Sequence, residues 1–303
     1  MPKSAVRSLV VAQPSVSAVV LTYNRKDLLE ECLTALREQT RSPDRVTVVD
    51  NHSSDGTAAF VRAHFPEVDL LALPTNEHCA GGYHEGIRSA HAAGADWIWL
   101  LDDDAIPSPD ALEQLTAALD DLGSLPPPLL LAGKVIWNDG RLHPMNVPGF
   151  EREDAELYVD ASGRRLLPIR SSTFVSLFVS REAVDRYGLP HKSYVIYGDD
   201  IEYTARILQR ESGYLVPASV VHHKTKTPRT ASVSSGDRFY YHVRNLLYMM
   251  RGPVWTRTEK LSLAGSLVAT TLAYLRHNSF RRRQLLVVLR GVCDGLRRGA
   301  LRG

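Results

Sequence analysis

The chain has 303 residues, of which 44% are hydrophobic and 23% charged, and a formal net charge of +2. This composition is typical of a globular protein with one large domain or two small ones, and so small a net charge argues against general nucleic-acid binding. Three widely spaced cysteines without CxxC spacing argue against a disulfide framework or a zinc site and favour a reducing compartment. No apolar h-region precedes Pro14 and no stretch reaches the length of a spanning helix, so we expect neither a signal peptide nor a transmembrane segment.

The first part of the chain alternates apolar runs with helical patterns. Short runs rich in β-branched and apolar residues predict buried strands over 16–22, 45–50, 68–73 and 97–101. Helices are expected between them, over 28–36 with Asp27 as the N-cap, over 57–64 and over 83–93. This β-α-β-α-β-α-β order predicts a parallel, right-handed α/β sheet.

Polar residues follow each of these four strands. They are Thr22, Tyr23, Asn24 and Arg25 after the first, Asp50 and Asn51 after the second, Asn76 after the third, and Asp102, Asp103 and Asp104 after the fourth. Ligands of parallel sheets bind beyond the carboxyl ends of the strands, so this convergence predicts a binding site.

The acidic triplet Asp102–Asp104 carries the strongest signal. Three consecutive carboxylates repel one another unless a cation lies between them, and hard oxygen ligands suit Mg²⁺ or Mn²⁺, which bridge phosphates. The alternative is a solvated acidic turn before a helix that starts at Pro107.

The second part of the chain is less regular. A helix is expected over 110–122, then a strand over 129–137 after three prolines, and a loop or hairpin over 138–165. A strand over 172–179, a helix over 181–187, a short strand over 194–197, a helix over 203–211 and an extended piece over 214–221 follow.

Four weaker signals have structural alternatives. Asp50 can accept from a base or a ribose, or can cap the next helix, a position for which Asp55 competes. Gly81 and Gly82 admit a ligand close to the backbone or serve a tight turn. Asp199, Asp200 and Glu202 provide a general base near a cation or stabilise a helix dipole, and the His222-His223 pair offers metal ligands or a structural histidine.

The ordered set of motifs resembles the inverting nucleotide-sugar glycosyltransferases of family 2. The matching pieces are Val19-Val-Leu-Thr-Tyr-Asn-Arg, Val48-Val-Asp-Asn-His-Ser-Ser-Asp-Gly, Asn76 with Gly81-Gly82, Leu100-Leu-Asp-Asp-Asp-Ala, Gly198-Asp-Asp-Ile-Glu and Val216-Pro with Val221-His-His-Lys. The resemblance implies a GT-A fold, which is an α/β, Rossmann-like, mostly parallel central sheet flanked by helices, here with a helical C-terminal extension. The Leu-Asp-Asp-Asp form is similar to actinobacterial galactofuranosyltransferases, and to rhamnosyltransferases of the same family.

The resemblance also implies roles for individual residues. Donor binding falls to Thr22, Asn24, Arg25, Asp50, Asn76, Gly82, Asp102 and Asp103, metal binding to Asp104 and His223, and catalysis to Asp200 as the base with Asp199 beside it. His222 competes with His223 for the metal. The segment Ser176-Leu-Phe-Val stands where many members carry glycines before the acceptor loop, so we expect a narrower or reshaped acceptor pocket.

These roles predict an Mn²⁺- or Mg²⁺-dependent transfer, with galactofuranose from UDP-galactofuranose as the first choice of donor. The acceptor implied by the resemblance is a hydroxyl of a glycan on a polyprenyl diphosphate, in cell-wall or surface polysaccharide synthesis. A rhamnosyltransferase using dTDP-rhamnose is the alternative within the family. A nucleotidyltransferase is a less favoured alternative, because this sequence lacks the glycine-rich loop expected near the N-terminus of such an enzyme. A non-catalytic module that binds a sugar nucleotide is also less favoured, because the acidic residues are all present.

We expect an N-terminal extension over 1–15, a catalytic domain over 16–235 with a nucleotide-sugar half (16–107) and an acceptor half (108–235), and a helical, basic region over 236–303. From Arg276 onward there are eight arginines against one acid, Asp294. Apolar surface beside arginine favours an anionic membrane surface, here the inner face of the plasma membrane. The alternatives are a helical pair packed on the catalytic domain and a homo-oligomer interface.

Overall fold

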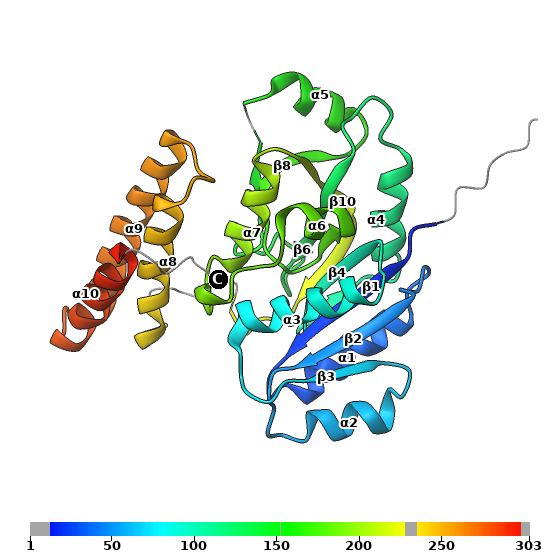
Figure 1. Cartoon of the computed structure of the whole chain (residues 1–303), viewed down its shortest axis with the longest axis horizontal. Coiled ribbons are helices and arrows are strands. Elements are labelled where there is room, and N and C mark those ends of the chain that lie inside the picture. The colour runs from blue at the N-terminus through cyan, green and yellow to red at the C-terminus, as the bar shows by residue number, and fades with distance from the viewer. Residues whose placement is uncertain (1–12, 152, 228–234, 298–303) are drawn as a thin grey trace, which may run out of the picture.

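The computed structural model describes residues 13–151, 153–227 and 235–297, and it is built around a ten-stranded sheet (Figure 1). The strands are β1 (Val16–Thr22), β2 (Arg45–Asp50), β3 (Asp69–Ala72), β4 (Trp97–Asp102), β5 (Ala105–Pro107), β6 (Pro128–Ile136), β7 (Gly149–Phe150), β8 (Leu167–Ser171), β9 (Leu177–Ser180) and β10 (Ser212–His223). The helices are α1 (Lys26–Arg37), α2 (Thr57–His64), α3 (His78–Ala92), α4 (Ala111–Asp120), α5 (Ala155–Gly163), α6 (Arg181–Tyr187), α7 (Asp199–Leu208), α8 (Phe239–Arg251), α9 (Arg257–His277) and α10 (Arg282–Leu296), with short 3-10 turns η1 (Lys192–Tyr194) and η3 (Gly236–Arg238). Most of the expected N-terminal extension, residues 1–12, lies outside the described residues.

The order of the strands places the predicted polar residues at one edge. The sheet runs β3-β2-β1-β4-β9-β6-β10-β8-β7, with β5 paired to β10. The first four strands are parallel, as predicted, and the register sets Thr22 opposite Asp50 and Leu21 opposite Asp102. In the other half β9 runs antiparallel to β4 and β6, so the sheet as a whole is mixed. The predicted α/β class is therefore confirmed, and its parallel part is the half that carries the acids.

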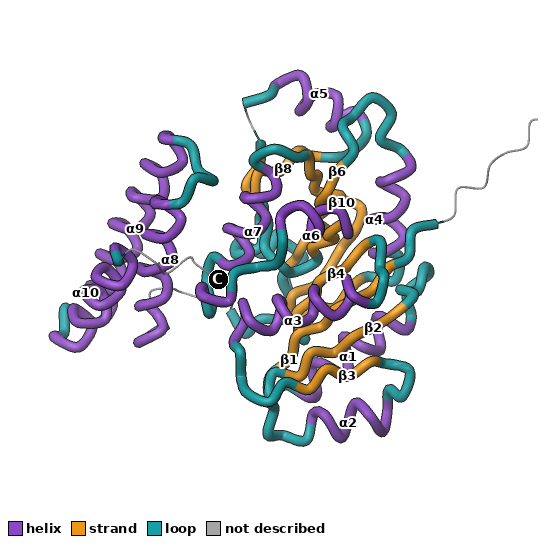
Figure 2. The backbone as a smooth tube through the Cα atoms, viewed as in Figure 1, coloured by secondary structure: helices purple, strands orange, loops and turns teal. Residues whose placement is uncertain are grey.

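Helices cover both faces of the sheet, which explains why its strands are almost continuously apolar (Figure 2). Successive residues of β1 point to opposite faces. Ala18 and Val20 pack with α1, α2 and α4, whereas Val19 packs with α3, α6 and α7. Packing between these two apolar layers holds β1 and β4 in place. The residues that directly follow these two strands are therefore held in defined positions.

Two predictions in the first half were wrong in detail. The helix expected over 83–93 begins at His78 and takes Gly81 and Gly82 into its first turns, although paired glycines usually indicate a turn. A Cβ on Gly82 would lie 2.3 Å from Leu21 Cδ1, so this glycine serves the close packing of α3 on β1. The residue that caps α1 is Arg25 rather than Asp27, and Pro107 ends β5 instead of starting a helix.

The second half departs further from its prediction. The expected loop over 138–165 contains β7 and α5, whose first turn is capped by Asp154 through the backbone N–H of Leu157. The strand expected over 172–179 starts later, as β9, and a separate strand, β8, precedes it. The short strand expected over 194–197 is a 3-10 turn and a loop, and α7 starts at Asp199 instead of residue 203. Local pattern fails here because these segments pair with distant strands and helices.

Helices α8, α9 and α10 form a layer of their own beside the sheet (Figure 1). They share a small apolar cluster in which the rings of Phe239 and Tyr274 stack at 4.0 Å between centroids. A second cluster, with Tyr194 of η1 and Tyr248 and Met249 of α8, joins this layer to the sheet domain. Across the described ranges, no helix combines the length and the hydropathy that crossing a bilayer requires.

Candidate active site

The acidic triplet lies where β4 turns into β5. Asp103 and Asp104 are buried, and Asp102 has a side chain that is 32% exposed. β5 runs antiparallel to β10 and sets Ala105 opposite His223. This pairing carries a histidine from the far end of the chain to the acids, so the cluster depends on the fold rather than on any local sequence pattern.

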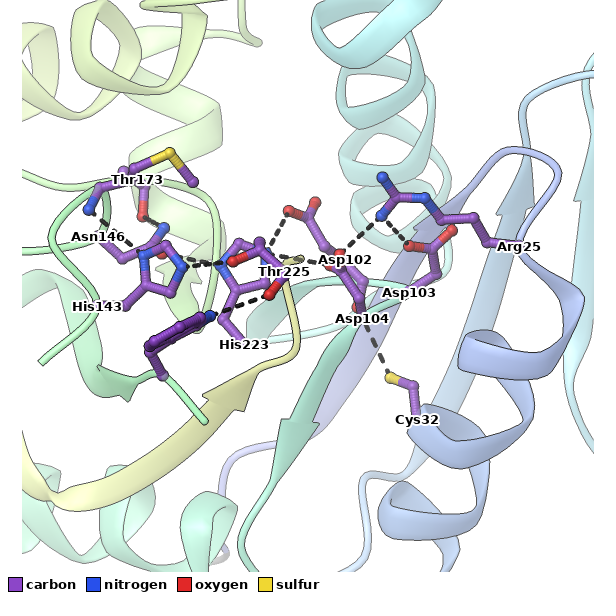
Figure 3. A network of polar contacts seen from close by, with 12 residues as sticks. Arg25, Cys32, Asp102, Asp103, Asp104, His143, Asn146, Thr173, His223 and Thr225 are labelled. Carbon is purple, nitrogen blue, oxygen red and sulfur yellow. Dashed lines mark hydrogen bonds and ion pairs between the residues drawn. The ribbon is translucent and has the colours of Figure 1, made fainter. Parts of the chain in front are cut away.

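Asp102, Asp104 and His223 lie close enough together that they could hold a divalent cation (Figure 3). One ligand atom of each lies within 4.8 Å of the others, and His223 Nε2 lies 3.0 Å from Asp104 Oδ1 and 3.7 Å from Asp102 Oδ2. Two carboxylates and an imidazole suit a small divalent cation such as Mn²⁺ or Mg²⁺. The neighbouring His222 is exposed, so of the two histidines only His223 reaches the acids.

Arg25 balances the charge of the triplet. Its guanidinium lies 2.7 Å from Asp104 Oδ2 and 3.2 Å from Asp103 Oδ1, and the Thr22 hydroxyl donates to Asp103 at 2.9 Å. Burial, opposed by Arg25 and reinforced by the other two acids, raises the pKa of Asp103 to about 7. Burial alone would lower the pKa of His223, but its hydrogen bond to Asp104 and the charges of both acids raise it.

A second layer of polar residues orients His223 (Figure 3). The Nδ1 of His223 donates to Asn146 Oδ1 at 2.8 Å, and the Asn146 amide donates to Thr173 at 2.9 Å. The ring of His143 lies 4.8 Å from that of His223 between centroids, and its Nε2 meets the Thr225 hydroxyl at 2.9 Å. With Nδ1 occupied, Nε2 is left to face the acids. Sequence reasoning missed Asn146 and His143, because both lie in a segment that carries no motif.

Replacing Asn146 by alanine is expected to weaken Mn²⁺ binding by about 10- to 100-fold, the usual scale for a group that orients a metal-binding histidine. The His223 ring would lose the acceptor that fixes its tautomer. Titration of the protein with Mn²⁺, followed by electron paramagnetic resonance, measures the effect. Asn138→Ala, in the same segment but exposed, is the matched control. Equal affinity in the two variants would contradict the orienting role.

The second acidic group stands at the start of α7. Asp199 is buried, and within the described residues its Oδ2 has no hydrogen-bond partner. Burial and the charge of Asp200 raise the pKa of Asp199 well above its usual range. Asp200 is half-buried and accepts from the Ile201 N–H at 2.8 Å, and burial followed by the charge of Asp102 raises its pKa to about 6. The raised pKa of Asp199 favours its protonated form, whereas Asp200, with a pKa of about 6, is mainly ionised at pH 7, so Asp200 is the better placed of the two to accept a proton.

The loop before α7 is held from α8. Val195, Tyr197 and Gly198 all have positive φ, at 66°, 68° and 82°, a region that is costly for a β-branched residue. The buried amide of Asn245 donates to the carbonyls of Tyr194, Ile196 and Tyr197 at 2.9, 2.9 and 2.7 Å. This one side chain therefore supports the strained turn that presents Asp199 and Asp200.

Two adjoining clefts meet at Asp102. The first, of about 530 Å³, is called here the donor cleft and extends from the acids toward the ends of β1 to β3. The second, of about 410 Å³, is called the acceptor cleft and extends toward α7. Five of the residues predicted to bind a donor line the donor cleft, namely Thr22, Arg25, Asn76, Asp102 and Asp103. The acceptor cleft is lined by Asp199, Asp200 and His223 among others.

Three predicted donor residues do not line the donor cleft. Gly82 is buried inside α3 against Leu21, so a close approach to a ligand is not its role in this fold. Asn24 accepts from the Ser54 N–H at 2.7 Å, and Asp50 accepts from the Ser53 N–H at 3.0 Å, so both shape the turn after β2. Asn24 and Asp50 therefore hold the backbone of a loop at the edge of the sheet. Their position at the ends of strands could not show that they have this structural role.

Other residues make contacts at the site that the sequence did not indicate, and one of them, Asn51, was expected only as a polar residue at a strand end. Asn51 lines the donor cleft and holds the β3–α3 loop through the His78 carbonyl at 2.8 Å and the Glu77 N–H at 2.7 Å. The Tyr83 hydroxyl donates to Asp102 at 2.5 Å. The segment expected to reshape the acceptor pocket, Ser176-Leu-Phe-Val, is buried in the core, and Phe174 and Val175 line the acceptor cleft in its place.

Comparison with known proteins places this geometry in a family. A model described as glycosyl transferase family 2 matches residues 17–157. Galactofuranosyltransferase GlfT1 of Mycolicibacterium smegmatis is 30% identical over 227 residues, which cover 68% of this chain and 70% of that protein. GlfT1 of Mycobacterium tuberculosis is 30% identical over 214 residues, covering 64% of this chain and 65% of that protein. Glycosyltransferase AglE of Haloferax volcanii is 26% identical over 204 residues, covering 66% of this chain and 63% of that protein.

Solved structures resemble this chain over nearly its whole length, although their sequence identity to it is low. A crystal structure of S. aureus TarS 1-349 matches with a TM-score of 0.61 at 16% identity, covering 95% of this chain and 81% of that one. The same protein in complex with UDP-GlcNAc matches with a TM-score of 0.60 at 15% identity, covering 95% and 82%. This likeness confirms the predicted GT-A fold with a helical C-terminal region.

Proposed function

The chain belongs to glycosyl transferase family 2, and on this premise we propose that it is a metal-dependent, inverting galactofuranosyltransferase. The proposed reaction moves galactofuranose from UDP-galactofuranose to a hydroxyl of a glycan carried on a polyprenyl diphosphate, in the synthesis of a cell-wall or surface polysaccharide. The observation that carries the proposal is the meeting of the two clefts at Asp102, a member of the possible metal-binding set Asp102, Asp104 and His223, while the carboxylate of Asp200 lines the acceptor cleft. The two GlfT1 relatives support the choice of sugar.

The donor cleft fits a nucleotide sugar. Asn51 and Asn76 line the donor cleft beyond the ends of β2 and β3, where a base and ribose would lie. A cation held by Asp102, Asp104 and His223 would supply Lewis-acid stabilisation of the departing diphosphate. The UDP and UDP-GlcNAc named with the TarS structures support a donor of this class.

The acceptor cleft accounts for the rest of the reaction. Asp200 takes the proton of the acceptor hydroxyl, and that oxygen bonds to the anomeric carbon of the donor. The bond from this carbon to the diphosphate oxygen breaks, and UDP leaves with the electron pair. A single displacement from the opposite face inverts the configuration. Asp199 is buried next to Asp200 at the start of α7, and its raised pKa makes it the weaker candidate for the base.

A donor panel tests the proposal. The protein is incubated with Mn²⁺ and UDP-galactofuranose, UDP-galactopyranose, UDP-GlcNAc or dTDP-rhamnose, with and without a prenyl-diphosphate-linked disaccharide acceptor. Release of nucleoside diphosphate and extension of the acceptor are both measured. We expect acceptor-dependent release with UDP-galactofuranose. Turnover of dTDP-rhamnose alone would overturn the choice of sugar, and turnover of none would overturn the proposed activity.

The pH dependence of transfer follows from Asp200. Its pKa of about 6 means that the base is protonated and inactive at lower pH and ionised above it. We therefore expect kcat/KM to fall about tenfold for each pH unit below 6 and to reach a plateau above roughly pH 7. Initial rates across this range measure it, with Mn²⁺-dependent UDP binding as the control. A rate that is flat from pH 5 to 7 while UDP binding is unchanged would contradict the assignment.

We also propose that helices α9 and α10 rest on an anionic membrane surface at the inner face of the plasma membrane. Leucines and valines on both helices are strongly exposed, among them Leu261 at 73%, Val268 at 60% and Leu289 at 57%. Arginines such as Arg276 and Arg290 are exposed on the same helices. Apolar side chains flanked by guanidinium groups are typical of helices that lie in the plane of a membrane interface.

Replacing two of these apolar side chains tests the membrane surface. The variant Val268→Glu with Leu289→Glu is expected to lower binding to phosphatidylglycerol vesicles by about tenfold or more, since each residue loses the burial of a full side chain. Flotation of the full chain measures it. The matched control, Leu142→Glu with Val159→Glu, changes residues that are 52% and 66% exposed on the catalytic domain. Equal flotation of the two variants would contradict the assignment.

A further inference from the structure

A cavity of about 870 Å³ lies between α8 and α10, apart from the metal donors and Asp200. Four guanidinium groups line it: Arg238 comes from the turn before α8, and Arg282, Arg283 and Arg290 come from α10. The packing of the helices therefore brings Arg238 to the basic stretch at the start of α10 and to Arg290 two turns further along.

Few of these charges are neutralised within the protein. Arg283 pairs with Asp237 at 2.5 Å. The other lining acid, Asp294, accepts from the Tyr240 hydroxyl at 2.8 Å and pairs with Arg297, outside the cavity, at 3.0 Å. Among the described residues no ion pair involves the three remaining arginines of the cavity. Arginine forks in such a place match the oxygens of phosphate groups.

The cavity also has an apolar side. Leu286 and Val287 line it together with the arginines, and Leu286 is 44% exposed. Leu285 and Leu289 of the same helix are 40% and 57% exposed. A free inorganic anion gains nothing from this apolar surface, whereas an amphiphile with an anionic head and a hydrocarbon chain uses both parts.

The cavity adjoins the donor cleft. Arg238 and Tyr241 line both this cavity and the donor cleft. The Arg244 guanidinium lies 4.9 Å from the centre of the Tyr241 ring and donates to the carbonyls of Ser193 and Tyr194 at 2.6 and 2.9 Å. An occupant of the cavity would therefore lie beside the donor cleft and against Tyr241, whose ring lies next to the Arg244 guanidinium.

We propose that this cavity binds the diphosphate head of a prenyl lipid, with the arginines on the phosphates and the prenyl chain leaving over Leu285 and Leu289. The inference rests on the proposed function, because the lipid is the carrier of the acceptor glycan. It adds the place where the carrier is held, which is the helical layer and not the acceptor cleft itself.

Binding of farnesyl diphosphate to the full chain tests the proposal, at saturating Mn²⁺ and UDP so that the donor cleft is already occupied. Inorganic diphosphate and farnesol are titrated alongside it. The test variant is Arg282→Gln with Arg290→Gln. The matched control, Arg257→Gln with Arg276→Gln, removes the same charge from exposed positions of α9 that do not line the cavity.

We expect farnesyl diphosphate to bind at least about tenfold more tightly than either fragment, and the test variant to lose about tenfold or more while the control keeps its affinity. Equal affinity in both variants would overturn the proposal, and inorganic diphosphate binding as tightly as farnesyl diphosphate would reduce the cavity to a simple anion site. Failure of the proposed activity is seen separately, as absence of Mn²⁺-dependent turnover of any nucleotide sugar by the unaltered protein.

Discussion

Asp200→Asn is expected to lower sugar transfer by about 10²- to 10⁴-fold, the scale usual for loss of a general base. The asparagine keeps the shape of the side chain, and its carbonyl oxygen still accepts from the Ile201 N–H. Binding of the donor should be unchanged, because Asp200 lines the acceptor cleft and not the donor cleft. Single-turnover transfer at saturating donor, together with calorimetric binding of UDP, separates the two effects.

Asp199→Asn is the matched control for this prediction. The pKa of Asp199 lies well above its usual range because of burial and the charge of Asp200, which favours the protonated side chain. An asparagine there copies the protonated acid, and we expect less than about a tenfold loss of transfer. A large loss in Asp199→Asn with near-normal transfer by Asp200→Asn would exchange the roles of the two residues.

Removing a metal ligand should have an effect of similar size. Asp104→Asn takes away a buried carboxylate that lies 3.0 Å from His223 Nε2 and 2.7 Å from Arg25. If the cation contributes several kcal/mol to stabilising the leaving diphosphate, the loss of transfer is on the order of 10³-fold. Rates measured against Mn²⁺ concentration, and Mn²⁺ affinity measured directly, show whether the metal or the chemistry has been lost.

The control for the ligand is Asp139→Asn, an exposed acid in the segment that carries His143 and Asn146. It should leave both the rate and the Mn²⁺ dependence unchanged. Thermal unfolding of both variants guards against a folding defect, since Asp104 also pairs with Arg25. Full activity of Asp104→Asn, or full activity of the unaltered protein in EDTA, would contradict the metal-dependent mechanism.

The parallel half of the sheet was predictable because its information is local. The strands over Val16–Thr22 and Arg45–Asp50 were predicted at their observed bounds, since short β-branched runs followed by polar residues leave few alternatives. Parallel pairing then follows from the alternation with helices, and it brings the acids to one edge without any knowledge of distant contacts.

What the sequence could not predict depends on pairing over long distances. His223 reaches the acids through the antiparallel pairing of β10 with β5, and Asn146 reaches His223 from a segment without a motif. The start of α7 was missed because Asp199 and Asp200 follow residues with positive φ, which a pattern of hydrophobicity does not encode. Gly82 was assigned to ligand contact because a glycine's role as a packing residue shows only once its neighbour Leu21 is in place.

The hydrogen bonds from Asn245 to the carbonyls of Tyr194, Ile196 and Tyr197 mean that the catalytic unit includes α8. The family match ends at residue 157, yet the turn that positions Asp200 is held by the side-chain amide of Asn245, nearly ninety residues later in the chain. A fragment trimmed after β10 would leave three peptide carbonyls to water and remove the brace from a backbone turn of unfavourable conformation. Such a fragment would keep the nucleotide-facing residues at the strand ends. It would lose the support of the turn that positions Asp199 and Asp200, so we expect it to bind nucleotide better than it transfers sugar.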